Sequence, residues 1–145
     1  MDTIRKLLDD KGTDIWSIGP DETVYDAVKM MTLQDLGALA VVEDGRLVGM
    51  ISERDCARHI VRGKKPAKDT PVRDIMAMEV IYANPRTSMD ECMAIMSEHR
   101  IRHIPILEDD KLVAMISLRD LANVIVKEQD MKIKELETLS YYHGT

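Results

Sequence analysis

A serine and an aspartate stand three residues apart at two places in this chain, each time after a short apolar run. The first pair is Ser52 and Asp55, and the second is Ser117 and Asp120. One interpretation is structural, because Ser is a favoured N-cap residue and Asp suits the first turn of a helix. The other is chemical: a helix N-terminus offers N–H groups to a phosphate, and a carboxylate one turn along can accept hydrogen bonds from ribose hydroxyls. The two interpretations are compatible, and the spacing leaves both open.

Four cationic or titratable side chains crowd residues 99–103, which read His-Arg-Ile-Arg-His, although the net charge of the chain is −6. They suit the end of a helix, where cations meet the negative end of the dipole. They also suit phosphate recognition, in which Arg acts as a bidentate donor. The corresponding residues of the first half, 34–38, read Gln-Asp-Leu-Gly-Ala and carry no base. This difference predicts two unequal sites.

Other patterns in the chain give no support to catalysis or to a metal site. The sequence lacks a nucleophile elbow, a P-loop and a dinucleotide-binding glycine fingerprint, so we expect no enzyme. His99 and His103 are four residues apart, but a strand is expected to begin between them, and no Cys or carboxylate completes a typical ligand set. Arg54 and Arg119, which lie inside the two Ser–Asp motifs, are interpreted as surface cations near the mouth of a site.

An internal repeat supplies the elements that would position these residues. Shifted by 65 residues, the chain aligns with itself without a gap, so that ALAVVEDGRLVGMISERD (38–55) falls on HIPILEDDKLVAMISLRD (103–120). Each copy is predicted to hold a brief strand, a helix, two strands and a second helix. The brief strands fall at 15–18 and 80–83. We therefore expect an α/β (α+β) chain of two tandem β-α-β-β-α repeats, 1–65 and 66–145, with a polar linker at 63–71.

Apolar spacing and turn residues define the elements within each copy. Helical stripes run through matching positions: Val24, Ala27, Val28 and Met31, then Met89, Cys92, Met93 and Met96. Ser88 and Glu91 form a capping-box pattern at the start of the second stripe. Asp44-Gly45 predicts a two-residue hairpin turn, and Asp109-Asp110 is a weaker version of it.

The last helix carries more apolar residues than its repeat requires, since Met131, Ile133, Leu136 and Leu139 continue the pattern beyond it. One interpretation is that this tail packs back on its own chain. The other is that it contributes to a dimer. The sequence does not decide between them.

Length, charge and cysteine usage narrow the class of protein. The 145 residues contain no run of about 18 apolar residues, so we expect no membrane span. The N-terminal segment has no apolar signal core, which predicts a cytoplasmic protein. Cys56 and Cys92 then read as reduced thiols at apolar positions. The negative net charge disfavours nucleic acid as a partner.

The doubled unit, with Gly49-Met-Ile-Ser-Glu-Arg-Asp55 and Ile101-Arg-His-Ile-Pro-Ile-Leu107, resembles a pair of CBS domains, the modules named after cystathionine β-synthase. The resemblance covers about residues 4–130. It implies two units packed sheet against sheet about a pseudo-twofold axis, with two clefts lined by both repeats. It also implies that adenosine compounds bind there: AMP, ADP or ATP, and in some members NAD or S-adenosylmethionine.

The resemblance implies roles for individual residues. Asp55 and Asp120 would hold ribose, and Ser52 and Ser117 would lie near ribose or phosphate.

Two further sets follow from the same match. Arg102 and His103 occupy positions that contact phosphates in the family. The positions beside the base are two strand residues and two methionines: Trp16, Ile81, Met50 and Met115.

We therefore expect a non-catalytic regulatory module that senses adenine nucleotides, forms a homodimer and passes the ligand state to an unidentified effector protein. It would need no cofactor beyond its nucleotide ligand. The alternative is a dimerisation or interaction scaffold whose clefts stay empty.

Overall fold

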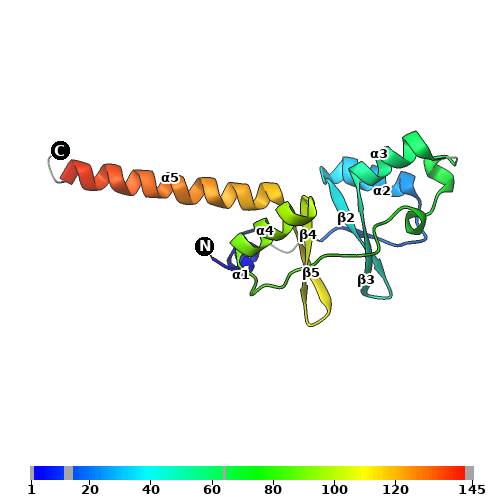
Figure 1. Cartoon of the computed structure of the whole chain (residues 1–145), viewed down its shortest axis with the longest axis horizontal. Helices are drawn as coiled ribbons and strands as arrows, with labels where there is room; N and C mark the ends of the chain where they lie inside the picture. The colour runs from blue at the N-terminus through cyan, green and yellow to red at the C-terminus, as the bar shows by residue number, and fades with distance from the viewer. Residues whose placement is uncertain (1, 12–14, 64, 143–145) are drawn as a thin grey trace.

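The computed structural model describes residues 2–11, 15–63 and 65–142, which form two similar α/β halves (Figure 1). The first half holds β1 (Ser17–Ile18), α2 (Val24–Gln34), β2 (Ala38–Glu43), β3 (Arg46–Ser52) and α3 (Glu53–Arg62). The second half holds α4 (Met89–His99), β4 (His103–Glu108), β5 (Lys111–Ser117) and α5 (Leu118–Tyr142). Three short helices complete the chain: α1 (Ile4–Lys11), η1 (Ala67–Asp69) and η2 (Val72–Asp74). The expected α/β fold of two repeats is confirmed.

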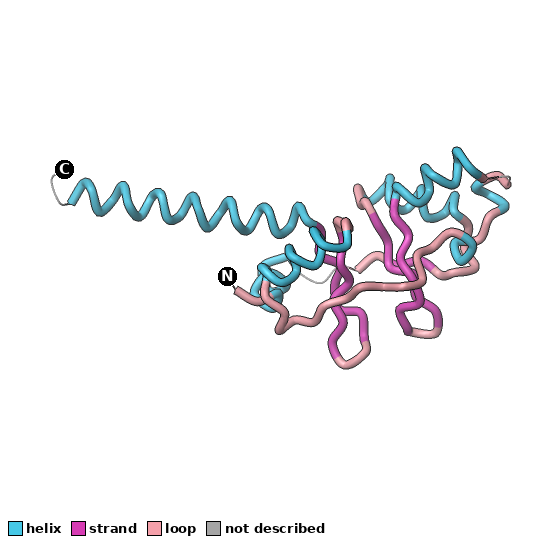
Figure 2. Tube along the Cα trace, viewed as in Figure 1, coloured by secondary structure: helices cyan, strands magenta, loops and turns pink. Residues whose placement is uncertain are grey.

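The two sheets have the same hairpin at their centre. β2 pairs with β3 and β4 pairs with β5, both antiparallel, and each hairpin has a register shift at the same place, between Val41 and Val42 and between Ile106 and Leu107. β3 contacts β5, so the two hairpins lie side by side (Figure 2). The packing of sheet against sheet that the resemblance implied is therefore present.

The brief first strand differs between the halves. β1 pairs in parallel with β2, whereas the strand expected at 80–83 is reduced to a single bridge between Ala83 and Ile106. Pro105 explains the difference, because it has no N–H to donate to a neighbouring strand. Its counterpart in the first half is Ala40, which does have one.

Both hairpin turns adopt the predicted left-handed backbone. The φ angles are 52° at Asp44 and 77° at Gly45, and 51° at Asp109 and 63° at Asp110. Two consecutive positive φ angles are the requirement of a type I′ turn, whose twist matches that of the strands. The second turn reaches this conformation without a glycine.

The two hydrophobic cores exchange short segments across the boundary between the sequence repeats at 65 and 66. α1 contributes Ile4, Leu7 and Leu8 to the core of the second half, and Val72 of η2 lies in the core of the first. The main-chain bonds are equivalent: Ile4 N–H donates to Thr87 O at 2.9 Å, and Val72 N–H donates to Glu22 O at 2.7 Å. Each half thus needs a segment from the other copy to close its core.

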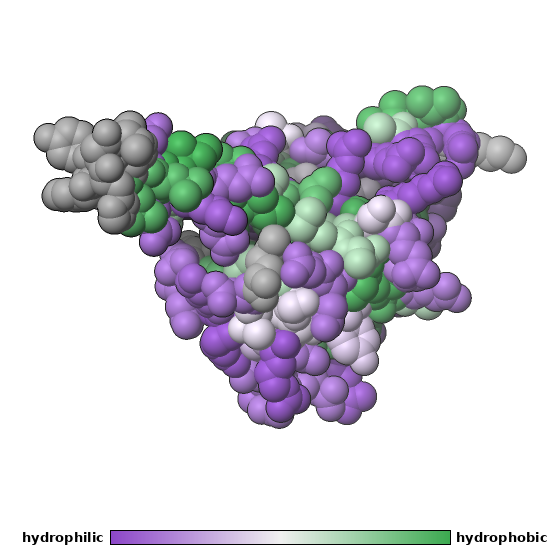
Figure 3. All heavy atoms as spheres, turned by 60° about the vertical axis from the view of Figure 1, so that its left-hand side comes forward, coloured by the Kyte–Doolittle hydropathy of each residue, from purple (hydrophilic) through white to green (hydrophobic). Residues whose placement is uncertain are grey.

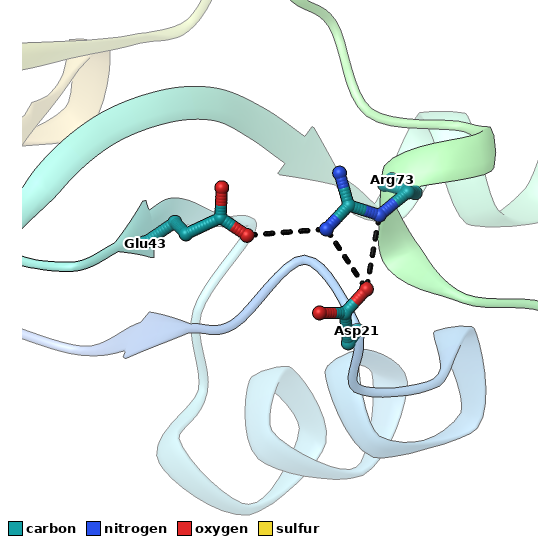
Figure 4. Close-up of polar contacts among 3 residues, drawn as sticks. All are labelled: Asp21, Glu43 and Arg73. Atoms are coloured by element: carbon teal, nitrogen blue, oxygen red, sulfur yellow. Dashed lines mark hydrogen bonds and ion pairs between the residues drawn. The ribbon is translucent and has the colours of Figure 1, made fainter.

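Matching ion pairs secure the two exchanged segments. Arg73 donates to Asp21 at 2.8 Å and to Glu43 at 3.1 Å (Figure 4), and these partners raise the pKa of its guanidinium. Arg5 donates to Glu108, the counterpart of Glu43, at 2.7 Å. All of these groups are exposed, so the pairs orient the segments more than they stabilise them.

α5 projects well beyond the second half as a single helix (Figure 2). Its first turns pack on α4 and bury Leu121, but from Val126 to Leu139 its side chains are exposed. Within this range the interpretation that the tail packs back on its own chain is wrong. None of the described helices is long and apolar enough to cross a membrane.

Candidate functional site

Two cavities lie between the halves, and each takes residues from both. The first, called here the Asp55 cleft, has a volume of about 640 Å³. It is lined by the end of β3 and the start of α3 from the first half, and by residues 79–81 and 100–103 from the second. Of the predicted site residues it contains Met50, Ser52, Asp55, Ile81, Arg102 and His103.

The second cavity, the Asp120 cleft, has a volume of about 990 Å³. It is lined by the end of β5 and the start of α5 together with residues of the first half. Of the predicted site residues it contains Trp16, Arg102, His103, Met115, Ser117 and Asp120. All ten predicted residues therefore line one cavity or both, and both volumes fall within the range typical of small-molecule sites.

The Ser–Asp motif of the first half is a complete capping box. Asp55 N–H donates to Ser52 Oγ at 3.1 Å, and Asp55 Oδ2 accepts from Ser52 N–H at 3.0 Å and from Ser52 Oγ at 2.9 Å. None of these bonds involves Asp55 Oδ1. The capping interpretation is thus confirmed, and it holds the half-buried carboxylate in a fixed orientation at the cleft.

The second motif repeats this geometry. Ser117 N–H donates to Asp120 Oδ2 at 2.8 Å, and Asp120 N–H donates to Ser117 Oγ at 3.1 Å. Both serine hydroxyls are therefore occupied in capping. A ligand phosphate would meet them only in competition with the helix.

The helix starts are also bonded to the residue that directly precedes the first hairpin strand of their own half. Glu53 N–H donates to Gly37 O at 3.0 Å, and Leu118 N–H donates to Arg102 O at 2.8 Å. These bonds use one further first-turn N–H of each helix, so fewer amides remain for an anion than the motif alone suggested. Phosphate recognition would then depend on side-chain cations.

Arg102 and His103 sit where the two clefts meet, and they line both. A Cβ at Gly37 would lie 2.9 Å from His103 Cε1, so the glycine leaves the space that the imidazole occupies. Gly37 and Ala38 are the sequence counterparts of Arg102 and His103. The second copy thus places a basic dipeptide beside a dipeptide of small residues from the first copy, at the point where the two clefts meet.

The charges around the two clefts differ. The Asp55 cleft is lined by four arginines and three carboxylates: Arg54, Arg58, Arg100, Arg102, Glu53, Asp55 and Glu79. The Asp120 cleft is lined by two arginines and three carboxylates: Arg102, Arg119, Asp35, Glu53 and Asp120. The expectation of unequal sites is supported, but its stated basis needs correction, because the basic dipeptide is shared and other residues create the difference.

The largest single contrast is a charge reversal at one equivalent position. Arg100 ends α4 with φ 55°, and Asp35 ends α2 with φ 53°, both as left-handed C-caps. They are 65 residues apart, and each lines a different cleft. The same backbone position therefore offers a cation to one cleft and an anion to the other.

Sequence reasoning missed some of the lining residues. Arg58 lies one turn after Arg54 on α3, and this spacing of four was a signal that could have placed it at the cleft. Glu79 belongs to the irregular stretch between the halves, and no motif marked it. Asp35 was noted only as a member of the segment 34–38, which carries no basic side chain.

The structure gives no support for a metal centre within residues 2–11, 15–63 and 65–142, where no group of three or more His, Cys, Asp or Glu side chains gathers. Cys56 and Cys92 are buried free thiols, one in each core. Burial raises the pKa of each to about 11. Both thiols therefore stay protonated at neutral pH and have little reactivity.

Comparison with protein families gives a match to the CBS domain over residues 11–62 and 72–127. The chain is 41% identical over 127 residues to "CBS domain-containing protein CBSX3, mitochondrial" of Arabidopsis thaliana, covering 84% of this chain and 60% of that protein. It is 35% identical over 120 residues to "CBS domain-containing protein YhcV" of Bacillus subtilis, covering 82% of this chain and 84% of that protein. The chain thus spans about three fifths of the Arabidopsis relative.

Solved structures show the same fold. A CBS domain structure, NE2398, superposes with a TM-score of 0.84 at 39% identity and covers 87% of this chain and 99% of that chain. The CBS domain pair of protein MJ0100, solved in complex with 5′-methylthioadenosine and S-adenosyl-L-methionine, has a TM-score of 0.78 at 21% identity and covers 87% of this chain and 97% of that chain. At that identity the second likeness concerns the fold alone.

Proposed function

Because this chain belongs to the CBS-domain family, we propose that it is a non-catalytic regulatory module that binds adenine nucleotides in the Asp55 and Asp120 clefts. The observation that carries the proposal is the meeting of both Ser–Asp helix starts with Arg102 and His103 in two cavities between the repeats. A carboxylate, cations and apolar side chains around one cavity match the three parts of a nucleotide.

Ribose recognition rests on the two aspartates. Each carboxylate is held by a capping bond from a serine N–H through Oδ2, so its position is set before a ligand arrives. In the Asp55 cleft the capping bonds leave Oδ1 as the oxygen that would accept from a ribose hydroxyl. An ionised acceptor of fixed orientation makes a stronger bond than a neutral one.

Phosphate recognition rests on arginines, since the first-turn amides are largely occupied. Arg102 serves both clefts, while Arg54, Arg58 and Arg100 belong to the Asp55 cleft alone. The Asp120 cleft offers Asp35 where the other has Arg100. The Asp55 cleft therefore suits ligands with more phosphate charge, such as ADP, ATP or NAD. The Asp120 cleft suits AMP or S-adenosylmethionine, which carry less negative charge.

The base would lie among aliphatic side chains. Met50 and Ile81 line the Asp55 cleft, and Met115 lines the Asp120 cleft beside the half-exposed Trp16. Apolar surfaces of this kind bury the faces of a purine without requiring aromatic stacking. The adenosyl ligands of the MJ0100 domain pair support this class of ligand for a CBS pair.

The regulatory role includes a homodimer and an effector protein that reads the ligand state. The nucleotide is the ligand whose binding would bias the assembly, with a typical coupling of about 1–3 kcal/mol. A cytoplasmic location stays a prediction, and the Arabidopsis relative carries a mitochondrial name.

Thermal unfolding with AMP, ADP, ATP, NAD, S-adenosylmethionine and adenosine tests the proposal. A ligand at about 100 times its Kd adds roughly 2.7 kcal/mol of stability. Each kcal/mol moves the Tm of a chain of this size by about 2–4 °C. We expect a nucleotide-specific rise that is reduced when Asp55 or Asp120 is replaced by Ala. A flat response of folded protein to the whole panel would favour the ligand-free scaffold.

A further inference from the structure

The exposed part of α5 carries a regular apolar seam. Its positions are spaced alternately by four and three residues along one side of the helix: Ala122, Val126, Gln129, Ile133 and Leu136. Val126 is 62% exposed, Ile133 53% and Leu136 58%. Figure 3 shows apolar atoms of this helix, in green, between hydrophilic ones. A spacing of four and three is the heptad pattern of a helix that pairs with another helix.

The residue types at the seam favour a two-stranded pair. With Val126 and Ile133 at position a of the heptad, Leu136 falls at position d. β-branched residues at a with leucine at d are typical of parallel dimers. Gln129, at the other full d position, is polar and interrupts the apolar seam.

The charges beside the seam are complementary to those of a second copy. Lys132 occupies position g and Glu137 the following e, so in a parallel pair each lysine faces the other copy's glutamate. In an antiparallel pair position e would face e, and the acidic Asp130 and Glu137 would oppose each other. The charge pattern therefore favours a second copy of this chain in the parallel direction over the antiparallel one.

We propose that the exposed part of α5 pairs with α5 of a second copy of this chain as a parallel two-stranded coiled coil. Val126, Ile133 and Leu136 form its apolar seam, and Lys132 and Glu137 form ion pairs across it. Ala122, at the start of the seam, lines the Asp120 cleft, but Val126, Ile133 and Leu136 line neither cleft, so the pairing rests on the proposed homodimer and not on nucleotide binding. It assigns the dimer contact to the helix that extends beyond the repeat.

Disulfide trapping in the full-length chain tests the pairing without nucleotide. Leu136→Cys places a thiol on the seam, where the two copies would come within the short Cα separation that a disulfide requires. Met131→Cys is the matched control, because Met131 is 70% exposed but lies on the outer side of the helix. The native thiols interfere little, since both are buried and their pKa is about 11. We expect Leu136→Cys to form a disulfide-linked dimer under mild oxidation. We expect Met131→Cys to form no such dimer under the same conditions.

Charge reversal in the Leu136→Cys background tests direction. Lys132→Glu should slow the trapping about fivefold, because two exposed ion pairs become repulsive. Adding Glu137→Lys should restore the rate of the Leu136→Cys variant alone, since the pairs are then re-formed in reverse. These exposed positions lie outside both cores, and circular dichroism is the check that each variant keeps its helix. Equal trapping at 131 and 136, no trapping at 136, or failure of Glu137→Lys to rescue would overturn the parallel pair.

Discussion

The Asp55 and Asp120 clefts are built on the same backbone but are lined by different charges. Their helix starts share the Ser–Asp capping bonds, and both take Arg102 and His103 from the centre of the molecule. The Asp55 cleft adds further arginines, whereas the Asp120 cleft has Asp35 at the position equivalent to Arg100.

This contrast separates what an internal repeat preserves from what it leaves free. The capping boxes and hairpin turns are fixed by backbone requirements that both copies must meet. The residue at a left-handed helix end needs only a tolerable φ angle, so its charge can differ between copies. Duplicated sites can therefore keep their geometry while their preference for ligand charge diverges.

The largest effect is expected from Asp55→Asn and Asp120→Asn, each of which should weaken nucleotide binding in one cleft. Both carboxylates are half-buried, and loss of a charged hydrogen-bond acceptor weakens binding by about 10-fold to 100-fold. Titration calorimetry should show weaker binding at one class of site in each variant and at both classes in the double variant.

Asp26→Asn is the matched control for these variants. Asp26 forms the same kind of capping box with Thr23 but lines neither cleft. It should lower helix stability to a similar degree and leave the affinity unchanged. If all three variants lose affinity together, the effect comes from folding and the ribose role is wrong.

Arg102→Ala should weaken phosphate binding in both clefts at once. The side chain is exposed, so the expected loss is smaller, about tenfold for ADP or ATP and little for adenosine. Affinities for the two ligands at low and high salt measure this difference. Arg86→Ala is the control, because Arg86 is exposed but lines neither cleft. It should leave both affinities unchanged. An equal loss for adenosine would argue against a phosphate contact.

The repeat and the chemistry around it could be predicted because they are local in sequence. The Ser–Asp spacing, the Asp44-Gly45 turn and the apolar stripes each depend on residues a few positions apart. The Ser–Asp pairs and the basic residues 102 and 103 could be singled out from spacing alone, whereas the two clefts between the repeats and the positions of Trp16, Ile81, Met50 and Met115 followed from the resemblance to CBS domains.

The other features of the fold and the site depend on how the two repeats pack against each other, and no local sequence pattern encodes that packing. Amphipathic spacing in α1 indicates a buried face but cannot show that this face joins the core of the second half. Arg102 could serve both clefts only because it lies at the centre, a position that requires knowledge of the packing. The prediction of a strand at 80–83 was wrong because its neighbouring strand contains Pro105, which has no N–H to donate to it.

A smaller effect is expected at the charge-reversed pair. Arg100→Asn should weaken ATP in the Asp55 cleft by about two- to fivefold, and Asp35→Asn should strengthen it in the Asp120 cleft by a similar factor. Asn is the suitable replacement because it tolerates the positive φ of both positions. Calorimetric titrations at two salt concentrations would show the two affinities approaching each other. If the affinities of the two clefts do not change, charge at this position does not set their preference.

The smallest effect concerns the hairpin turns, where the copies share a conformation but not a residue. Asp110 has φ 63°, which a glycine adopts without steric cost, whereas its counterpart Gly45 already uses that freedom at φ 77°. Asp110→Gly should therefore raise the free energy of unfolding by about 0.5 kcal/mol, and Gly45→Asp should lower it by a similar amount. Asp110→Ala is the control, because it removes the same carboxylate but keeps the Cβ, and it should not stabilise the protein. Urea unfolding of the three variants measures the differences. If Asp110→Gly and Asp110→Ala change stability equally, the effect comes from the lost charge, and the second turn is not strained relative to the first.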